Sequence, residues 1–319
     1  MKIGFHSTQL DIRGTCVSLY DYAHYYETIF GGKSVIITQY SNKHDENALY
    51  KFAKRFEIRY YSKKEDIDDL LHDCELFYII KYGKNDGIIS KKVKTCVHCV
   101  FDMTEPHGDI YAGVSDTLAK KFGKSKFVPH MIGLPPSHTQ ENLREKLKIP
   151  SDAIVFGRHG GADTFDLNIA KTAIIHVVND KPNFHFIFVN TPLFYHHPRI
   201  HHINKIVDLD EKNRFIMSCD AMVHAQSLGE TFGIAIGEFS VNNKPIIAYN
   251  GWVWNDHYKN ILGDRALWYT TEEECYGKMF HFNPKEYENK DMNCYKQYSP
   301  EIVMQQFKEV FIDSIPENN

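Results

Sequence analysis

AMVHAQSLGETFGIAIGEFSVNNKPIIAYN, residues 221–250, predicts a buried strand, a helix and a second buried strand in succession. We expect the strands at 221–226 and 245–250 and the helix at 230–243. Both strands are largely apolar runs, which is typical of strands that are covered on both faces of a sheet. Two such strands joined by a helix form a parallel βαβ unit, so this stretch indicates the α/β class.

The same alternation continues on both sides of this stretch. Further strands are expected at 2–7, 34–39, 56–61, 75–82, 95–101, 109–115, 126–136, 153–158 and 183–191. Further helices are expected at 17–32, near 45–55, at 63–73, 116–122 and 166–180, and within 204–220. Prolines 135 and 136 open a connection that runs to residue 152 and interrupts the alternation.

This interruption predicts two domains, 1–132 and 133–319, and leaves the last helix able to pack back on the first domain. Each domain is expected to be a Rossmann-like α/β domain with a parallel sheet, and the two would face a cleft. In open sheets of this kind, ligands bind beyond the carboxyl ends of the strands.

The overall composition excludes several classes of protein. The 319 residues carry a formal net charge of −4, whereas a general nucleic-acid binder usually has a basic surplus. The longest apolar runs are as long as strands, well short of the roughly 20 residues of a transmembrane helix. The N-terminus turns polar too early for a signal peptide, so we expect a cytoplasmic protein without a transmembrane segment.

The cysteines and the clustered histidines do not predict a disulfide framework or a metal site. Seven cysteines are scattered singly, and Cys96 and Cys99 lie in an expected strand that places their side chains on opposite faces. Buried free thiols are the favoured interpretation. His197 and His201 have a metal-like spacing, but Pro198 interrupts any helix between them, so a solvated loop is favoured over a metal site.

A glycine-rich stretch, GRHGGADTFD at 157–166, follows an apolar run and predicts a diphosphate site. The planar guanidinium of Arg158 can donate two parallel hydrogen bonds to phosphate oxygens. The backbone amides of Gly160 and Gly161 can approach the same group closely.

The helix after residue 229 carries two carboxylates, Glu230 and Glu238, eight positions apart. On one helix they would be about 12 Å apart along the axis and within about 80° of the same face. Both could then reach one extended ligand such as a nucleotide sugar. The alternative is that Glu230 merely favours the helix dipole and that Glu238 is exposed. The helix is apolar nearly all round, which favours burial and hence a role for the carboxylates.

These motifs together resemble GT-B glycosyltransferases, in particular the large retaining family four with its E-x7-E signature. The resemblance rests on GETFG at 229–233, NKPIIA at 243–248, FGRHGG at 156–161, and VSDTLAKKFG at 114–123 followed by VPHMIG. It covers nearly the whole chain and is strongest over 153–250. The GRHGG variant resembles versions found in large DNA viruses and phages, which would place the protein in the host cytoplasm.

The resemblance implies a retaining transferase that moves a sugar from a nucleotide-diphosphate sugar to a glycan or other hydroxyl acceptor, without a metal or other cofactor. Arg158 would pair with the diphosphate, Glu230 would bind the donor sugar, and His98 would position the donor sugar or the acceptor. Glu238 would bind the ribose hydroxyls. Backbone groups would contribute further donor contacts, from Gly14, Gly160, Gly161, Thr231, Phe232 and Gly233. The resemblance also implies that the domain at 1–132 lies on the acceptor side and that the domain at 133–319 binds the nucleotide sugar.

The sequence departs from the family pattern at Asp163, where a lysine usually supplies a second cation for the leaving phosphate. Arg13 could supply the missing charge. His107 could line the cleft, and Trp252 and Trp254 could either stack on a sugar or pack in the core.

Three other functions compete with this interpretation. A nicotinamide-dependent oxidoreductase would need G-x-G-x-x-G after the first strand, and the chain lacks this motif there. A sugar-nucleotide epimerase would need further acid groups. A non-catalytic sugar-nucleotide or glycan-binding protein on the same fold stays open, because of Asp163.

Overall fold

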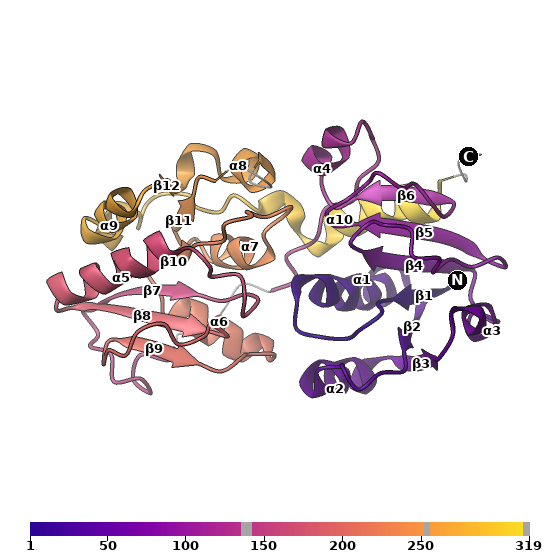
Figure 1. Cartoon of the computed structure of the whole chain (residues 1–319), viewed down its shortest axis with the longest axis horizontal. Helices are drawn as coiled ribbons and strands as arrows, with labels where there is room; N and C mark the ends of the chain where they lie inside the picture. Colours follow the sequence, from indigo (N-terminus) through magenta and orange to yellow (C-terminus); the bar gives the residue numbers. More distant parts are fainter. Residues whose placement is uncertain (135–141, 252–255, 315–319) are drawn as a thin grey trace. The chain divides into compact units, whose positions relative to one another are not determined.

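The structure is a computed structural model that describes residues 1–134, 142–251 and 256–314 (Figure 1). Trp252 and Trp254 lie outside the described residues. The chain forms two compact units: unit 1 is Met1–Gly133 with Gln297–Asn319, and unit 2 is Leu134–Lys296. The division after Gly133 falls one residue from the expected boundary.

Unit 1 is built on a six-stranded, all-parallel sheet with the order β3-β2-β1-β4-β5-β6. The strands are β1 Lys2–His6, β2 Lys33–Gln39, β3 Glu57–Tyr61, β4 Leu76–Lys81, β5 Lys94–Cys99 and β6 Ile110–Gly113. The order reverses between β1 and β4, which is where doubly wound sheets open a crevice for ligands.

The helices of unit 1 begin and end at recognisable signals. They are α1 Gly14–Phe30, α2 Glu46–Arg55, α3 Ile67–Leu70, α4 Asp116–Lys121 and α10 Pro300–Phe307, with the short 3-10 helices η1 Lys64–Asp66 and η4 Lys296–Tyr298 and the π-helix η5 Lys308–Ile312. Asp45 and Ser115 cap α2 and α4 through their side chains, and Gly31 ends α1 in a left-handed conformation. From the end of the chain, Phe307 and Phe311 pack against Tyr78 in the core of unit 1.

Unit 2 repeats this architecture with the strand order β12-β11-β10-β7-β8-β9, again all parallel. The strands are β7 Ile154–Arg158, β8 Phe184–Val189, β9 Ile200–Ile203, β10 Ala221–His224, β11 Ile246–Tyr249 and β12 Leu267–Tyr269. The helices are α5 Asn168–Asp180, α6 Leu209–Met217, α7 Ile234–Val241, α8 Asp256–Leu262 and α9 Glu272–Phe280, with the turns η2 Gly263–Arg265 and η3 Pro284–Glu286. Here the order reverses between β7 and β10.

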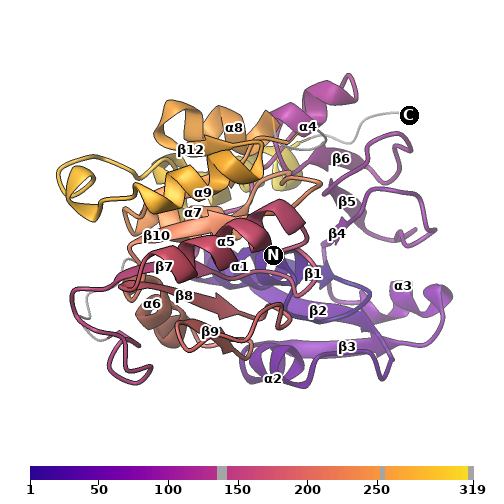
Figure 2. The same cartoon turned by 60° about the vertical axis from the view of Figure 1, so that its left-hand side comes forward.

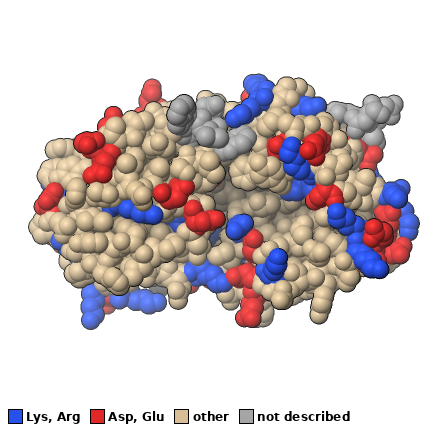
Figure 3. Space-filling view, in the orientation of Figure 1, with Lys and Arg blue, Asp and Glu red and all other residues tan. Residues whose placement is uncertain are grey.

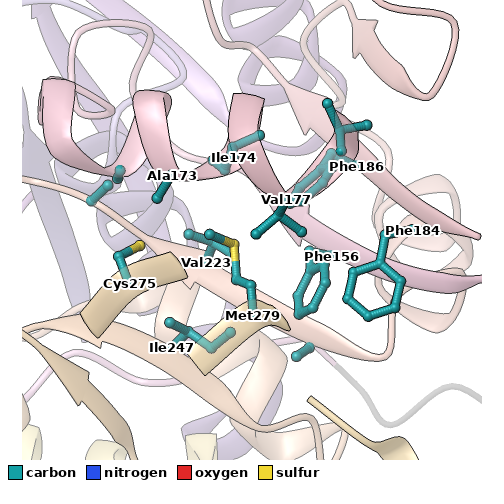
Figure 4. Packing of buried hydrophobic residues seen from close by; sticks show 14 of the residues in the cluster. Phe156, Ala173, Ile174, Val177, Phe184, Phe186, Val223, Ile247, Cys275 and Met279 are labelled. Carbon is teal, nitrogen blue, oxygen red and sulfur yellow. The ribbon is translucent and has the colours of Figure 1, made fainter. Parts of the chain in front are cut away.

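Helices cover both faces of the second sheet. The helices α5 and α9 lie side by side on one face (Figure 2). Figure 4 shows the core beneath them, where Val177 and Met279 meet Phe156 and Phe186 of the strands. Elsewhere in unit 2, α6 and α7 contact each other through Phe215 and Phe239, whose ring centroids are 5.7 Å apart. Burial on both faces confirms the α/β class read from the apolar strands.

Three expectations about local structure were wrong in whole or in part. The helix expected from residue 230 begins at Ile234, because Gly233 adopts a left-handed conformation with φ +83°. In the histidine-rich segment, His201 lies in a strand, β9, whereas His197 lies in the loop before it, as expected. The strand expected at 126–136 is reduced to one bridge between Gly113 and Phe127.

The cysteines behave as expected: Cys96 and Cys99 lie in β5, and all seven cysteines are buried and unpaired. No helix in the described part of the chain is long and apolar enough to cross a membrane. Within residues 1–134, 142–251 and 256–314, no three His, Cys, Asp or Glu side chains gather as a metal site would require. On the face seen in Figure 3, acidic and basic side chains are interspersed over each unit.

Candidate functional site

Two loops of unit 2 meet at the carboxyl edge of its sheet. One follows β7 and the other follows β10, and these strands are hydrogen-bonded neighbours at the reversal point. The backbone N–H of Asp166 donates to the carbonyl of Ala225 over 3.1 Å, and Ser227 N–H donates to the Asp166 carboxylate over 2.8 Å. The glycine-rich stretch and the GETFG stretch are therefore held side by side.

Arg158 is the last residue of β7 and is only 2% exposed. Its Nη2 donates to the Gly161 carbonyl over 2.7 Å and to the Thr164 hydroxyl over 2.6 Å. Its Nη1 donates to the Thr191 hydroxyl over 2.7 Å and more weakly to the Asn190 carbonyl. The guanidinium is thus fixed in one orientation by neutral groups.

The charge of Arg158 has no carboxylate partner at salt-bridge distance among the described residues. Burial lowers its pKa to about 10, although Glu230, Asp163 and Asp166 act in the opposite direction from farther away. A pKa of about 10 still keeps the guanidinium charged at neutral pH. A buried charge without a counterion is costly, and an anionic ligand would remove this cost.

The loop after Arg158 wraps around the guanidinium because of Gly160. This residue has φ +149°, and a Cβ there would lie 3.1 Å from Arg158 Nη2 and 3.3 Å from the Thr164 hydroxyl. Its carbonyl accepts a hydrogen bond from the Asn190 amide over 2.8 Å. The side chain of any other residue would crowd the guanidinium, so glycine at this position allows the loop to fold around Arg158.

Asp163 lies on the exposed part of the same loop. A Cβ on Gly161 would meet Asp163 Oδ1 at 3.2 Å, which places the carboxylate directly over the second glycine. The position that carries a cation in the resembled family therefore carries an anion beside the candidate phosphate site.

Glu230 lies in the loop before α7 and not on the helix. Its side chain is 29% exposed, and its Oε1 is 3.4 Å from Nε2 of His224, the last residue of β10. Since Glu230 and Glu238 do not share a helix, the expected 12 Å separation along one axis does not apply. Glu230 is nevertheless anchored at the carboxyl edge of the sheet, next to the loop of Arg158.

The start of α7 presents backbone donors. Gly233 is the N-cap, and no cap bond from a side chain closes this end of the helix. Thr231 and Phe232 are buried, and the Tyr295 hydroxyl donates to the Phe232 carbonyl over 2.8 Å, which fixes the turn. The first N–H groups of an α-helix have no partner within the helix, so this end can bind an anion or a hydroxyl oxygen.

Glu238 is buried within α7 and already has partners. Its Oε1 accepts a hydrogen bond from Lys212 Nζ of α6 over 2.7 Å. Its Oε2 lies 3.0 Å from His159 Nε2, but off the direction of a good hydrogen bond, so this contact is electrostatic. Burial acts to raise the pKa of Glu238, but Lys212 and His159 outweigh it and hold the pKa at about 2. The carboxylate is therefore ionised and oriented before any ligand binds.

The two site residues expected in unit 1 differ in placement. Gly14 is exposed and is the first residue of α1, where backbone donors are available. His98 is wholly buried in β5; its Nδ1 is 2.6 Å from the Tyr78 hydroxyl and its Nε2 is 2.8 Å from the Val128 carbonyl. Both ring nitrogens have partners and no part of the ring is exposed, so this structure gives no support to a contact between His98 and a sugar.

The structure thus gathers the expected unit 2 residues at one sheet edge and adds some that sequence reasoning missed. The missed residues are Thr164, Asn190, Thr191, His159, Lys212 and Asp166. Asn190 and Thr191 directly follow β8, and this position just after a parallel strand could have identified them as candidate site residues. Lys212 looked like an ordinary polar residue of a surface helix, and nothing in the sequence pairs it with Glu238.

Comparisons with known proteins show similarity in structure only. No family model matches the sequence, and no curated protein matches it. HepE of Anabaena, crystallised with UDP-glucose, matches with a TM-score of 0.73 at 14% identity over 97% of this chain and 98% of that one. A glycosyltransferase from Rickettsia africae matches with a TM-score of 0.70 at 12% identity over 98% and 99% of the chains.

Sucrose-phosphate synthase from Thermosynechococcus elongatus matches with a TM-score of 0.70 at 10% identity over 97% and 98% of the chains. At such identities the likeness shows the fold alone. It confirms the fold class, two Rossmann-like α/β units of the GT-B type.

Proposed function

We propose that the protein is a glycosyltransferase that moves a sugar from a nucleotide-diphosphate sugar to a hydroxyl acceptor, with retention of the anomeric configuration. The observation that carries the proposal is Arg158, a buried guanidinium at the carboxyl end of β7 that has no carboxylate at salt-bridge distance among the described residues. A diphosphate supplies the missing negative charge. Crystals of the similar HepE contain UDP-glucose, which supports this choice of ligand.

Each neighbouring group has a role in this proposal. Arg158 and the amides of Gly160 and Gly161 bind the diphosphate, and the backbone donors at Thr231, Phe232 and Gly233 assist from the start of α7. Glu230, partly exposed and anchored beside His224, accepts hydrogen bonds from hydroxyls of the donor sugar. Gly14, which is exposed at the start of α1, offers backbone N–H groups for a ligand contact in unit 1.

Glu238 binds the ribose hydroxyls in this proposal, and its surroundings favour that role. Lys212 and His159 keep the carboxylate ionised, and an ionised carboxylate is a stronger acceptor for a hydroxyl than a neutral acid. Because Lys212 already uses one oxygen, a ribose hydroxyl shares the carboxylate with this cation.

The reaction forms a bond between the acceptor oxygen and the anomeric carbon and breaks the bond between that carbon and the diphosphate oxygen. Retention follows from attack on the same face, with the acceptor proton passing to the departing phosphate. Arg158 and the backbone amides stabilise the charge that develops on the leaving group. We assign no step to His98, because its ring is wholly buried.

We also propose that no metal ion takes part, since Arg158 and the start of α7 can neutralise the leaving group. Seven unpaired cysteines favour a reducing compartment, which supports a location in the cytoplasm, or in the host cytoplasm for a viral protein.

A second candidate is a non-catalytic sugar-nucleotide-binding protein. The observation that favours it is Asp163, whose carboxylate lies over Gly161 and opposes the binding of phosphate charge. Turnover separates the two candidates, because both predict nucleotide binding and only the enzyme releases nucleotide when an acceptor is present.

The proposal is tested first by binding. We expect one class among UDP-, GDP- and ADP-sugars to raise the melting temperature, with or without EDTA, since a ligand of the native state stabilises it by mass action. Arg158→Lys should lose most of this shift. Glu230→Gln should keep the shift by the free nucleotide diphosphate and lose the extra shift given by the sugar.

Asp264→Asn, which removes an exposed carboxylate on η2, is the matched control and should behave as wild type. Two further measurements use the nucleotide class that binds. Release of the nucleotide tests transfer, and the anomeric configuration of the product tests retention. If none of the donors shifts the melting temperature of the wild type, the diphosphate site is disproved. Binding without nucleotide release for any acceptor would favour the non-catalytic candidate.

A further inference from the structure

A segment near the end of unit 2 is hydrogen-bonded to α7. This segment, residues 290–295, follows η3 and directly precedes Lys296, the last residue of unit 2. We call it the α7 strap. The proposed donor site contains no residue of the strap, but α7 and the turn before it carry Glu238 and the backbone donors of that site.

Two polar side chains fasten the strap to the far end of α7. The Ser240 hydroxyl donates to the Met292 carbonyl over 3.0 Å and accepts from the Cys294 N–H over 2.8 Å. The Asn243 side chain accepts from the Met292 N–H over 2.8 Å and donates to the Lys290 carbonyl over 3.0 Å. These hydrogen bonds hold the carboxyl-terminal half of the helix and the turn after it.

Tyr295 reaches the opposite end of α7. This residue is 1% exposed, and its hydroxyl donates to the Phe232 carbonyl over 2.8 Å. The two rings meet edge to face, with centroids 5.5 Å apart. A Cβ on Gly233 would lie 3.3 Å from the same hydroxyl. The hydroxyl therefore lies against the peptide bond that joins Phe232 to Gly233.

The hydrogen bond from Tyr295 fixes the orientation of this peptide. The Phe232 carbonyl and the Gly233 N–H belong to one planar trans peptide, in which they point in opposite directions. Because the carbonyl is held on the hydroxyl, the N–H of Gly233 points away from Tyr295. This N–H has no hydrogen-bond partner in the part of the chain that the structure describes, so it is available to a ligand.

Glycine at position 233 makes this orientation easy to lose. Its φ is +83°, and glycine adopts positive and negative φ about equally well. The peptide can therefore turn over at little steric cost unless its carbonyl is held. A turned peptide would withdraw the Gly233 N–H and present the Phe232 carbonyl oxygen, whose partial negative charge repels a phosphate.

We propose that Tyr295 is a positioning residue of the donor site, whose hydroxyl keeps the Gly233 N–H directed at the bound donor. The proposal rests on the proposed function and adds a residue that acts through the peptide between Phe232 and Gly233. The other side-chain links of the strap stabilise α7 without orienting this peptide, because Ser240 lies about 10 Å farther along the helix axis.

The alternative is that Tyr295 only packs against Phe232. Both roles predict a loss of stability when the hydroxyl is removed, so stability alone does not separate them. A matched pair of variants does. Tyr295→Phe removes the hydroxyl and keeps the ring, whereas Ser240→Ala removes a buried hydroxyl with two hydrogen bonds from the same strap and leaves the contact of Tyr295 intact.

The test compares the affinities of these variants and the wild type for UDP, GDP or ADP, whichever binds the wild type, by calorimetry. We expect Tyr295→Phe to bind it about three- to tenfold more weakly, as for the loss of one hydrogen-bond donor to the ligand. Ser240→Ala should keep the affinity within about twofold, although it should lower the melting temperature at least as much as Tyr295→Phe.

Asn243→Gly is a second control on the strap, and it keeps the experiment decisive if Ser240→Ala does not fold. Asn243 has φ +57°, which glycine tolerates, so this change removes two links of the strap without backbone strain. It should also keep the nucleotide affinity within about twofold. An unchanged affinity in Tyr295→Phe, or an equal loss in the control variants, overturns the proposal.

A measurement without ligand tests the contact itself. In NMR spectra of protein with isotope-labelled glycine, the Gly233 amide signal is assigned by its loss in Gly233→Ala. We expect this signal to shift or broaden in Tyr295→Phe and to keep its position in Ser240→Ala. A signal that is unchanged in Tyr295→Phe would overturn the proposal, because the peptide would then be held without the hydroxyl.

Failure of this proposal can be told apart from failure of the proposed function. If UDP, GDP and ADP all fail to bind the wild type, the donor site is disproved, and the positioning role is disproved with it. If one of them binds the wild type and Tyr295→Phe equally well, the donor site stands and only the positioning role is lost.

Discussion

Asp163 is the residue where the candidate phosphate site is weakest, because its carboxylate lies beside the charge that a diphosphate must approach. We expect Asp163→Lys to raise the affinity for the nucleotide-diphosphate donor by about three- to tenfold at low salt, since it replaces a repulsion by an attraction near the surface. The measurement is a titration of the donor identified by thermal shift, at low and at high ionic strength.

Asp163→Asn is the control for this change and should give about half the gain in binding free energy. The gain should shrink as salt is added, because charges at an exposed position are screened. An unchanged or lower affinity in Asp163→Lys would mean that the diphosphate does not approach this loop.

Glu238 gives a prediction about pH. Its pKa lies near 2 in the folded protein, below the usual 4.5, so its ionised form stabilises the fold above about pH 5. This stability is lost as the pH falls from about 5 towards 2. Urea unfolding of the wild type should therefore show a drop in stability over this range, and Glu238→Gln should show a smaller drop.

Lys212→Met should cost about 3–5 kcal/mol at pH 7, because it leaves the Glu238 carboxylate buried without its main counterion. The double variant Lys212→Met with Glu238→Gln should recover part of this loss, as measured by urea unfolding. If the single lysine variant were as stable as the wild type, the ion pair would not be formed in solution.

Single site residues could be predicted from the sequence where their position relative to an expected strand or helix was unusual. Arg158 ends an expected strand and precedes glycines, and Glu238 lies in an otherwise apolar helix, so both stood out. His98 was predicted from the family resemblance alone, and it lies inside β5, where its ring is covered by the core. Lys212 could not be found, because only tertiary packing brings α6 to α7.

At the scale of elements, Gly233 sets where α7 begins. Its φ of +83° is strained for other residues, and an added Cβ would lie 3.1 Å from Ile236 Cδ1 and 3.3 Å from the Tyr295 hydroxyl. We expect Gly233→Ala to destabilise the protein by about 1–3 kcal/mol and to weaken nucleotide binding. Urea unfolding and thermal shift with the donor measure the two effects.

Gly277 is the matched control, since it lies inside α9 with nothing within 4 Å of an added Cβ. Gly277→Ala should stabilise the protein by about 0.5–1 kcal/mol, because alanine is the better helix residue and no strain opposes it. Equal effects of the two alanine substitutions would contradict the left-handed cap of α7.

The last helix, α10, belongs to the core of unit 1. Phe307 is wholly buried, and its ring stacks on Phe5 and Tyr22. We expect Phe307→Ala to cost about 3–5 kcal/mol of unit 1 stability in urea unfolding. Ile302→Ala on the same helix is 53% exposed and should change stability by less than about 0.5 kcal/mol.

Element type was predictable where the pattern was long and apolar, as in α5 and β4. The failures share a physical cause. The strand β9, IHHI, is short and polar, and it forms because β8 offers it a neighbour, as the register of Phe186 with Ile200 shows. A pairing of this kind depends on the sheet and cannot be read from four residues.

At the scale of the whole molecule, the two units divide the proposed work, and hydrogen exchange can test this division. The nucleotide-diphosphate donor should protect amides after β7 and β10, at 159–167 and 225–233, because these loops carry the proposed phosphate and sugar contacts. Protection at 13–16 would support a ligand contact at Gly14. The first residues after β4 should show no protection by the donor, since no donor contact is proposed there.

The opposite pattern of protection would contradict the assignment of the donor to unit 2. Protection by the nucleotide sugar that is confined to the loops after β4 and β5 would mean that the two edges were assigned in the wrong order. Both sheets reverse their strand order in the same way, so topology alone permits either assignment. The side chains favour unit 2 for the donor. Among the described residues, β7 ends with a buried cation that has no carboxylate at salt-bridge distance, whereas β4 ends with a cation that Asp86 compensates. We therefore expect the anionic donor at unit 2.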